Sequence, residues 1–86
     1  MKKGIAGTIE SNDVKITVEE AEDLEIVIES IVLEFYGDQI KKVVEDTLNE
    51  REITHLHVLV QDKGALDYTI KSRLITAIER MEDHHE

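Results

Sequence analysis

The strict alternation of apolar and polar residues at positions 14–19 (VKITVE) is the feature that most constrains the fold of this chain. Successive side chains of a β-strand point to opposite faces of a sheet, whereas a helix would spread this pattern around its circumference. We therefore expect a strand with Ile16 buried and Lys15 exposed. A second alternation, at positions 24–28, predicts another strand with Ile26 buried and Glu25 exposed.

A looser alternation precedes these strands and places Ile5, Gly7 and Ile9 on one side of the chain. The triplet Ser-Asn-Asp at positions 11–13 separates it from the next run, and all three residue types favour turns through local side-chain hydrogen bonds. Two alternating runs joined by such a triplet predict a β-hairpin. Ser11 would lie at its tip.

The hydrophobic period changes in the second half of the chain. Apolar residues recur every three or four positions from Leu33 to Leu48, which predicts one face of a helix. Ser30 is a candidate N-cap for this helix. Gly37 interrupts the pattern and costs about 1 kcal/mol relative to alanine inside a helix, so a start near Asp38 also stays open.

The remaining elements complete a mixed α and β pattern. A fourth strand fits positions 53–61, with Leu56, Val58 and Val60 on one face, and a last helix fits positions 65–81 after a turn at 62–64. The predicted order is βββαβα. A single α+β domain over residues 1–86, a two-layer sandwich with both helices on one face of one sheet, would bury all the apolar faces.

The net charge of the chain excludes some classes of binding partner. Twenty acidic residues against ten basic residues give a net charge of −10. This balance argues against binding to nucleic acid or to an anionic membrane surface, and it favours a partner with basic patches. The chain has no cysteine, and no apolar run is long enough for a signal peptide or a membrane span. We expect a soluble, cytoplasmic protein.

Two histidines are the strongest candidates for a metal site. His55 and His57 are two residues apart, so a strand would point both the same way, as two zinc ligands require. No obvious third ligand lies nearby in the sequence. We therefore expect a solvated or cross-strand histidine pair and no metal site. His84 and His85 in the polar tail are weaker candidates still.

Catalytic motifs are missing from the rest of the sequence. No serine occurs in a G-x-S-x-G setting, and the four glycines are isolated rather than grouped in a phosphate-binding loop. We expect no autonomous enzyme. Ser11 is the hydroxyl of most interest, and its residue type and position allow two interpretations: a turn serine that satisfies backbone groups, or a protruding acceptor for a covalent modification.

Three segments together resemble one family. Residues 6–14, AGTIESNDV, are similar to the A-G-T-L-E-S-x-D-V signature of the acyl carrier protein of citrate lyase, its gamma subunit. Residues 62–67, DKGALD, resemble the D-K-G-A-L-D segment of the same family, and residues 35–38, FYGD, resemble its F-G-D element. The segments occur in the order and spacing of the family and cover nearly the whole chain.

The resemblance implies a carrier rather than a catalyst. In this family a serine, matched here by Ser11, carries 2′-(5″-phosphoribosyl)-3′-dephospho-CoA through a phosphodiester bond, attached by a prosthetic-group transferase. The thiol of this arm holds acetyl and citryl thioesters. The alpha subunit exchanges acetyl for citrate, and the beta subunit cleaves the citryl thioester to oxaloacetate. Asn12 stands where many relatives have Gly or Ser, and asparagine tolerates the same left-handed turn conformation.

Two alternatives stay open beside this interpretation. One is the carrier subunit of malonate decarboxylase, which bears the same kind of prosthetic group. The other is an acidic protein-interaction module without a covalent cofactor. A set of basic residues near the C-terminus is either a solvated helix face or a site that steadies the phosphates of the arm: Lys63, Lys71, Arg73 and Arg80.

Overall fold

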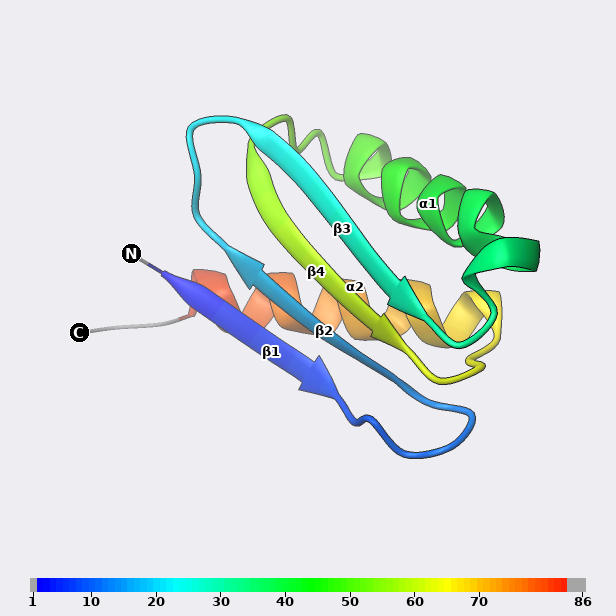
Figure 1. The fold of residues 1–86 in the computed structure, drawn as a ribbon. Helices are drawn as coiled ribbons and strands as arrows, with labels where there is room; N and C mark the ends of the chain where they lie inside the picture. The colour runs from blue at the N-terminus through cyan, green and yellow to red at the C-terminus, as the bar shows by residue number, and fades with distance from the viewer. Residues whose placement is uncertain (1, 84–86) are drawn as a thin grey trace.

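The computed structural model describes residues 2–83 of the chain. It contains four strands and two helices in the predicted order βββαβα (Figure 1). Their bounds are β1 Lys3–Gly7, β2 Val14–Glu19, β3 Leu24–Ser30, α1 Leu33–Glu50, β4 Leu56–Asp62 and α2 Asp67–Glu82. Neither helix is long and apolar enough to cross a lipid bilayer, within the residues that the structure describes.

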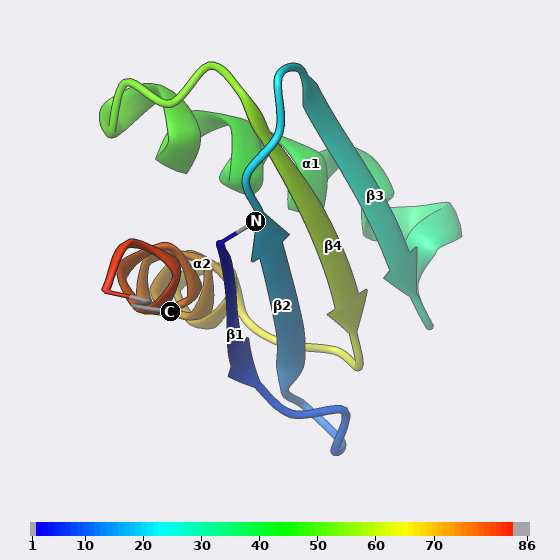
Figure 2. The same cartoon turned by 90° about the vertical axis from the view of Figure 1, so that its left-hand side faces the viewer.

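The four strands form one mixed sheet in the order β1-β2-β4-β3. β1 pairs with β2 and β2 with β4 in antiparallel fashion, whereas β3 and β4 are parallel and α1 connects them. Both helices cover the same face of the sheet (Figure 2). The predicted two-layer α+β sandwich is therefore confirmed, and the position of β4 between β2 and β3 is new information.

The core lies between the sheet and the two helices. Its strand members are Ala6 of β1 and the predicted inward positions of β2 and β4, and its helix members come from the apolar stripes of α1 and α2. Ile16 is fully buried, as predicted, and Glu25 is exposed. Ile26 is only half-buried because β3 is an edge strand, and Lys15 is half-buried between β1 and β4.

The small residues of β1 face the core, and its large apolar residue faces away from it. Gly4 and Ala6 point inward, whereas Ile5 is exposed. The reason is the close approach of α2, since a Cβ atom at Gly4 would collide with the carbonyl oxygen of Ala77. Only the smallest side chains fit at this contact, so size decides the orientation of β1 and hydrophobicity does not.

Helix α1 begins earlier than one of its two predicted starts. It runs from Leu33 through Gly37 without a break, so the start near Asp38 is wrong. The buried residues of α1 begin at Ile40, and their packing stabilises a helix that tolerates the weak helix propensity of one glycine. Ser30 is not the N-cap either, because Val32 holds that position. The Ser30 hydroxyl instead accepts a hydrogen bond from the Val32 N–H and donates one to Asp62 Oδ2, at 3.1 and 2.7 Å.

Candidate functional site

The loop between β1 and β2, residues 8–13, contains Ser11. Figure 1 shows this loop extending beyond the end of the sheet. The Asp13 N–H donates to the Glu10 carbonyl at 3.1 Å, which closes a turn with Ser11 and Asn12 at its centre. Asn12 has a φ of 66°. A positive φ at the third residue alone is typical of a type II turn, where asparagine or glycine is favoured. The predicted turn is confirmed, within a longer loop than the triplet suggested.

Two backbone hydrogen bonds tie this turn to the connection between β4 and α2. The Asn12 N–H donates to the Lys63 carbonyl at 2.8 Å, and the Lys63 N–H donates to the Asp13 carbonyl at 2.9 Å. These bonds extend the β2–β4 ladder beyond its last paired residues. Ser11 therefore directly precedes a backbone segment, Asn12 and Asp13, in which each residue makes one hydrogen bond to Lys63.

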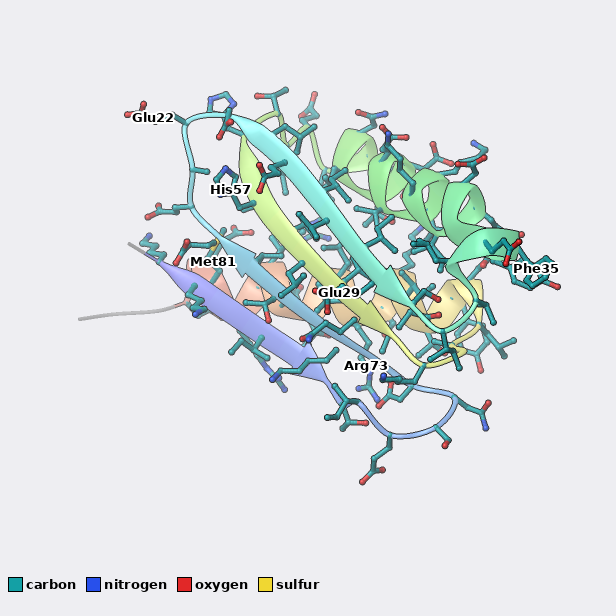
Figure 3. All side chains as sticks on the ribbon, viewed as in Figure 1. Glu22, Glu29, Phe35, His57, Arg73 and Met81 are labelled. Atoms are coloured by element: carbon teal, nitrogen blue, oxygen red, sulfur yellow. The ribbon has the colours of Figure 1, made fainter. Side chains whose placement is uncertain are left out.

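Asp13 is the centre of the loop's side-chain contacts. Its Oδ1 accepts from the Val14 N–H at 2.7 Å and from Arg73 Nε at 3.2 Å. Its Oδ2 accepts from the Thr8 hydroxyl at 2.8 Å and from Arg73 Nη2 at 3.1 Å. Arg73 comes from α2, so this carboxylate joins the loop to the helix layer. Figure 3 places Arg73 beside the start of β2.

These donors stabilise the ionised form of Asp13. The hydrogen bond from the Val14 N–H, followed by those from Thr8 and Arg73, lowers the pKa of Asp13 from 3.8 to about 2, against the opposing effect of partial burial. The carboxylate is consequently charged at neutral pH, and its contacts connect Thr8, the start of β2 and Arg73.

The Ser11 side chain is exposed, and within residues 2–83 no hydrogen bond engages its hydroxyl. A serine nucleophile that acts within its own protein needs a base within hydrogen-bond reach. The described residues supply no such base to Ser11. The arrangement offers an unactivated hydroxyl on a fixed support, which an external enzyme can reach.

The two candidate metal ligands lie away from this loop and do not act as a pair. His57 Nε2 is 2.7 Å from Asp23 Oδ1, whereas His55 precedes β4 and its Nδ1 is 2.7 Å from the Thr54 hydroxyl. Figure 3 shows His57 at the opposite end of the sheet from Arg73. Residues 2–83 contain no group of three His, Cys, Asp or Glu side chains that could hold a metal ion. His84 and His85 lie outside the described residues.

A depression of the surface of about 1120 Å³ also lies at this far end. It is open, and its lining includes Glu22, His57 and Met81, which Figure 3 labels. Its lining contains no serine or threonine that could serve as a nucleophile.

The four basic residues near the C-terminus do not form one patch. Arg80 donates to the Ile5 carbonyl at 2.8 Å, and Lys71 Nζ is 3.0 Å from Glu50 Oε2. Arg73 binds Asp13, and the backbone of Lys63 binds the loop. The sequence identified Asp13 only as a turn residue and missed its pairing with Arg73, because no local pattern relates residues so far apart.

Comparisons with known proteins agree with the resemblance carried by the loop. Residues 1–81 match the ACP family model described as malonate decarboxylase delta subunit (MdcD). The chain is 42% identical over 79 residues to the citrate lyase acyl carrier protein of Treponema denticola, which covers 92% of this chain and 91% of that protein. It is 48% identical over 80 residues to the citrate lyase acyl carrier protein of Oenococcus oeni, covering 92% and 82% of the two chains.

A solved structure has the same fold. One chain in the crystal structure of a Pseudomonas malonate decarboxylase hetero-tetramer in complex with malonate superimposes with a TM-score of 0.81, covering 93% of this chain and 84% of that one. The sequence identity is 18%, so this likeness concerns the fold alone. The identities to the curated relatives over most of their length are higher and decide the family. The chain belongs to the citrate lyase acyl carrier protein family.

Proposed function

We propose that this chain is the acyl carrier subunit of citrate lyase and that Ser11 is the attachment point of its prosthetic group. The observation that carries the proposal is the geometry of one serine: it belongs to the matched family motif, its hydroxyl is exposed, and it adjoins a backbone that two hydrogen bonds hold in place. A carrier needs a rigid attachment point, because the prosthetic arm should move between active sites while the protein that holds it keeps its conformation.

The proposed group is 2′-(5″-phosphoribosyl)-3′-dephospho-CoA, linked as a phosphodiester. Attachment forms a bond between Ser11 Oγ and the phosphorus that is bonded to the 5″-oxygen of the ribosyl unit, in an activated precursor in which this phosphorus is joined to a further phosphate through an anhydride. The anhydride P–O bond breaks, and its electron pair leaves with the departing phosphate. A base of the transferase takes the serine proton, since no described side chain of this chain is bonded to the hydroxyl.

The attached arm would supply a terminal thiol that carries acyl groups as thioesters. Tethering the thiol to one protein raises its effective concentration at several active sites in turn. The chain's own contribution is to hold the foot of the arm. Bond exchange and cleavage are then the work of the alpha and beta subunits, and the carrier does not catalyse them.

The carrier subunit of malonate decarboxylase remains a second candidate. One observation favours it: the description of the matching family model. The 42–48% identities to citrate lyase carriers favour citrate lyase. Assays of the loaded chain with citrate lyase subunits and with malonate decarboxylase subunits decide between the two, since only the correct partners should restore turnover.

The intact mass of the chain, co-produced with the prosthetic-group transferase, tests the attachment itself. We expect one added phosphoribosyl-dephospho-CoA per chain, mapped to the peptide that contains Ser11. Ser11→Ala should stay unmodified and should unfold like the parent. Ser72→Ala removes an exposed serine on α2 and should load normally. An unmodified parent chain would support the acidic interaction module, and a modified Ser11→Ala would contradict the site.

A further inference from the structure

The aromatic residues of this chain are all on its surface. The sequence contains two tyrosines and one phenylalanine, and their exposed fractions are 79% for Phe35, 53% for Tyr36 and 71% for Tyr68. Large aromatic side chains normally contribute most of their area to a core. A single exposed apolar residue needs no explanation, but a group of them marks an interaction site.

The three aromatics lie in the first turns of the two helices. We give the name aromatic patch to the exposed large apolar residues in these turns and just before them: Ile31, Leu33, Phe35, Tyr36, Leu66 and Tyr68. An open groove of about 690 Å³ runs through it, lined by Tyr36 and Ile40 on one side and by Ala65, Leu66 and Tyr68 on the other. Figure 3 shows Phe35 pointing away from the start of α1.

The aromatic patch is continuous with the Ser11 loop. Gly64 lines the groove, and a Cβ atom placed on it would lie 3.7 Å from Asn12 Oδ1 and 4.0 Å from Ile31 Cδ1. The preceding residue, Lys63, is hydrogen-bonded to the loop backbone. Figure 1 places the loop between β1 and β2 and the starts of both helices at the same end of the molecule. A protein that covers the patch would therefore also reach Ser11.

The charges around the patch indicate the chemistry of its partner. Glu34, Asp38 and Asp67 are exposed within the same segments, and Lys63 is the one basic residue among residues 31–38 and 63–68. Exposed aromatics surrounded by acids fit a partner surface that is apolar at its centre and carries lysine and arginine at its rim. A second copy of this acidic chain would be repelled.

We propose that the aromatic patch is the docking surface for the enzyme that transfers the prosthetic group to Ser11; the inference rests on the function proposed above. That enzyme must bring its reacting atoms into bonding distance of Ser11 Oγ, so it must cover the residues beside the loop. The alpha and beta subunits act on the thiol at the far end of a flexible arm. They can therefore react with it without covering the residues beside the Ser11 loop.

Loading kinetics test the proposal. The purified transferase is given increasing concentrations of unmodified carrier, and the rate of mass gain is followed by mass spectrometry. Phe35→Ala and Tyr68→Ala should each lower kcat/KM for loading at least about tenfold, mainly through KM. Val27→Ala removes an exposed aliphatic from the outer face of β3 and should load like the parent. Loading of the parent should slow as ionic strength rises.

The outcomes separate this inference from the proposed function. Equal kcat/KM values for the two aromatic variants and Val27→Ala would overturn the docking surface, while loading at Ser11 itself would still stand. Normal loading of the variants followed by loss of lyase turnover in the assembled complex would assign the patch to a lyase subunit and also overturn the proposal. A parent chain that is not loaded at all would overturn both. Phe35 and Tyr68 are largely exposed, so circular dichroism should confirm that the variants fold.

Discussion

Arg73 binds Asp13 with both ends of a planar fork, Nε to Oδ1 at 3.2 Å and Nη2 to Oδ2 at 3.1 Å, across sixty residues of sequence. The pair joins the Ser11 loop to α2. Two parallel hydrogen bonds fix the mutual orientation of the partners as well as their distance. The anchor beside Ser11 is therefore held by a side chain as well as by the backbone of the β4–α2 connection.

Removing this contact should loosen the loop more than it destabilises the fold. We expect Arg73→Ala to lower the free energy of unfolding by about 1 kcal/mol, because the guanidinium is partly exposed and water screens the pair. Lys71→Ala breaks the exposed contact with Glu50 and should cost about 0.5 kcal/mol or less. Urea unfolding measures both. Amide hydrogen exchange measures the mobility of the Ser11 loop and should be faster in Arg73→Ala than in the parent. Equal losses of stability in the two variants, or unchanged exchange in this loop, would contradict a special role for Arg73.

The charge on Asp13 should make part of the stability depend on pH. Its pKa is lowered from 3.8 to about 2 in the folded protein, so the unfolded chain takes up a proton first as the pH falls. The stabilisation is complete above about pH 5 and disappears as the pH falls from about 4 to about 2. We expect it to reach about 1 to 2 kcal/mol, after allowance for the partly solvated carboxylate.

Comparison with Asp13→Asn isolates this contribution, because the variant has no titrating group at this position. Unfolding by urea at a series of pH values between 7 and 2 should show the two proteins converging at the acidic end. A difference in unfolding free energy that stays constant over this range would mean that the carboxylate is not selectively stabilised in the folded state.

The buried register of β2 gives a second stability prediction. Ile16 lies opposite Val60 within the sheet and is fully buried against the helices. Truncation to alanine should cost about 2 to 5 kcal/mol through lost burial and a cavity. Lys15→Ala, on the other face of the same strand, should cost about 0.5 kcal/mol. Denaturant unfolding that finds the two substitutions equally harmless would contradict this register.

The fold could be predicted from the sequence where periodicity controls burial. The alternation around Ile16 and the helical stripe that ends at Leu48 both mark faces that are buried in the structure. Periodicity does not show which strands pair with one another, so the position of β4 between β2 and β3 could not be predicted from the sequence. It also misled for β1, since Ile5 is larger than Ala6 but a helix backbone passes too close for it to turn inward.

The candidate site was accessible from the sequence only in part. Turn chemistry and the family motif both led to Ser11, because such signals are local. The support of the loop depends on contacts between Asp13 and Arg73 and between Asn12 and Lys63, which only the folded chain brings together. The sequence did not predict the aromatic patch, because Leu33 and Tyr36 continue the apolar stripe of a helix and were expected to be buried, whereas both are about half exposed in the structure.

Two glycines should respond in opposite ways to the same substitution. A Cβ at Gly4 would collide with the backbone of α2 at Ala77, and neither backbone segment can move without separating β1 from the helix. Gly4→Ala should therefore lower the free energy of unfolding by about 1 to 3 kcal/mol. At Gly37 the nearest atom is Leu33 Cδ1, 3.0 Å from the new Cβ, and Leu33 is a half-exposed side chain that can rotate away.

Gly37→Ala should consequently gain up to about 1 kcal/mol from the higher helix propensity of alanine. Thermal or urea unfolding of the two variants beside the parent decides the matter. If Gly4→Ala is neutral, α2 does not lie as close to β1 as described. If Gly37→Ala destabilises the protein as much as Gly4→Ala, the first turn of α1 is not helical in solution, and the groove that begins there would have a different shape.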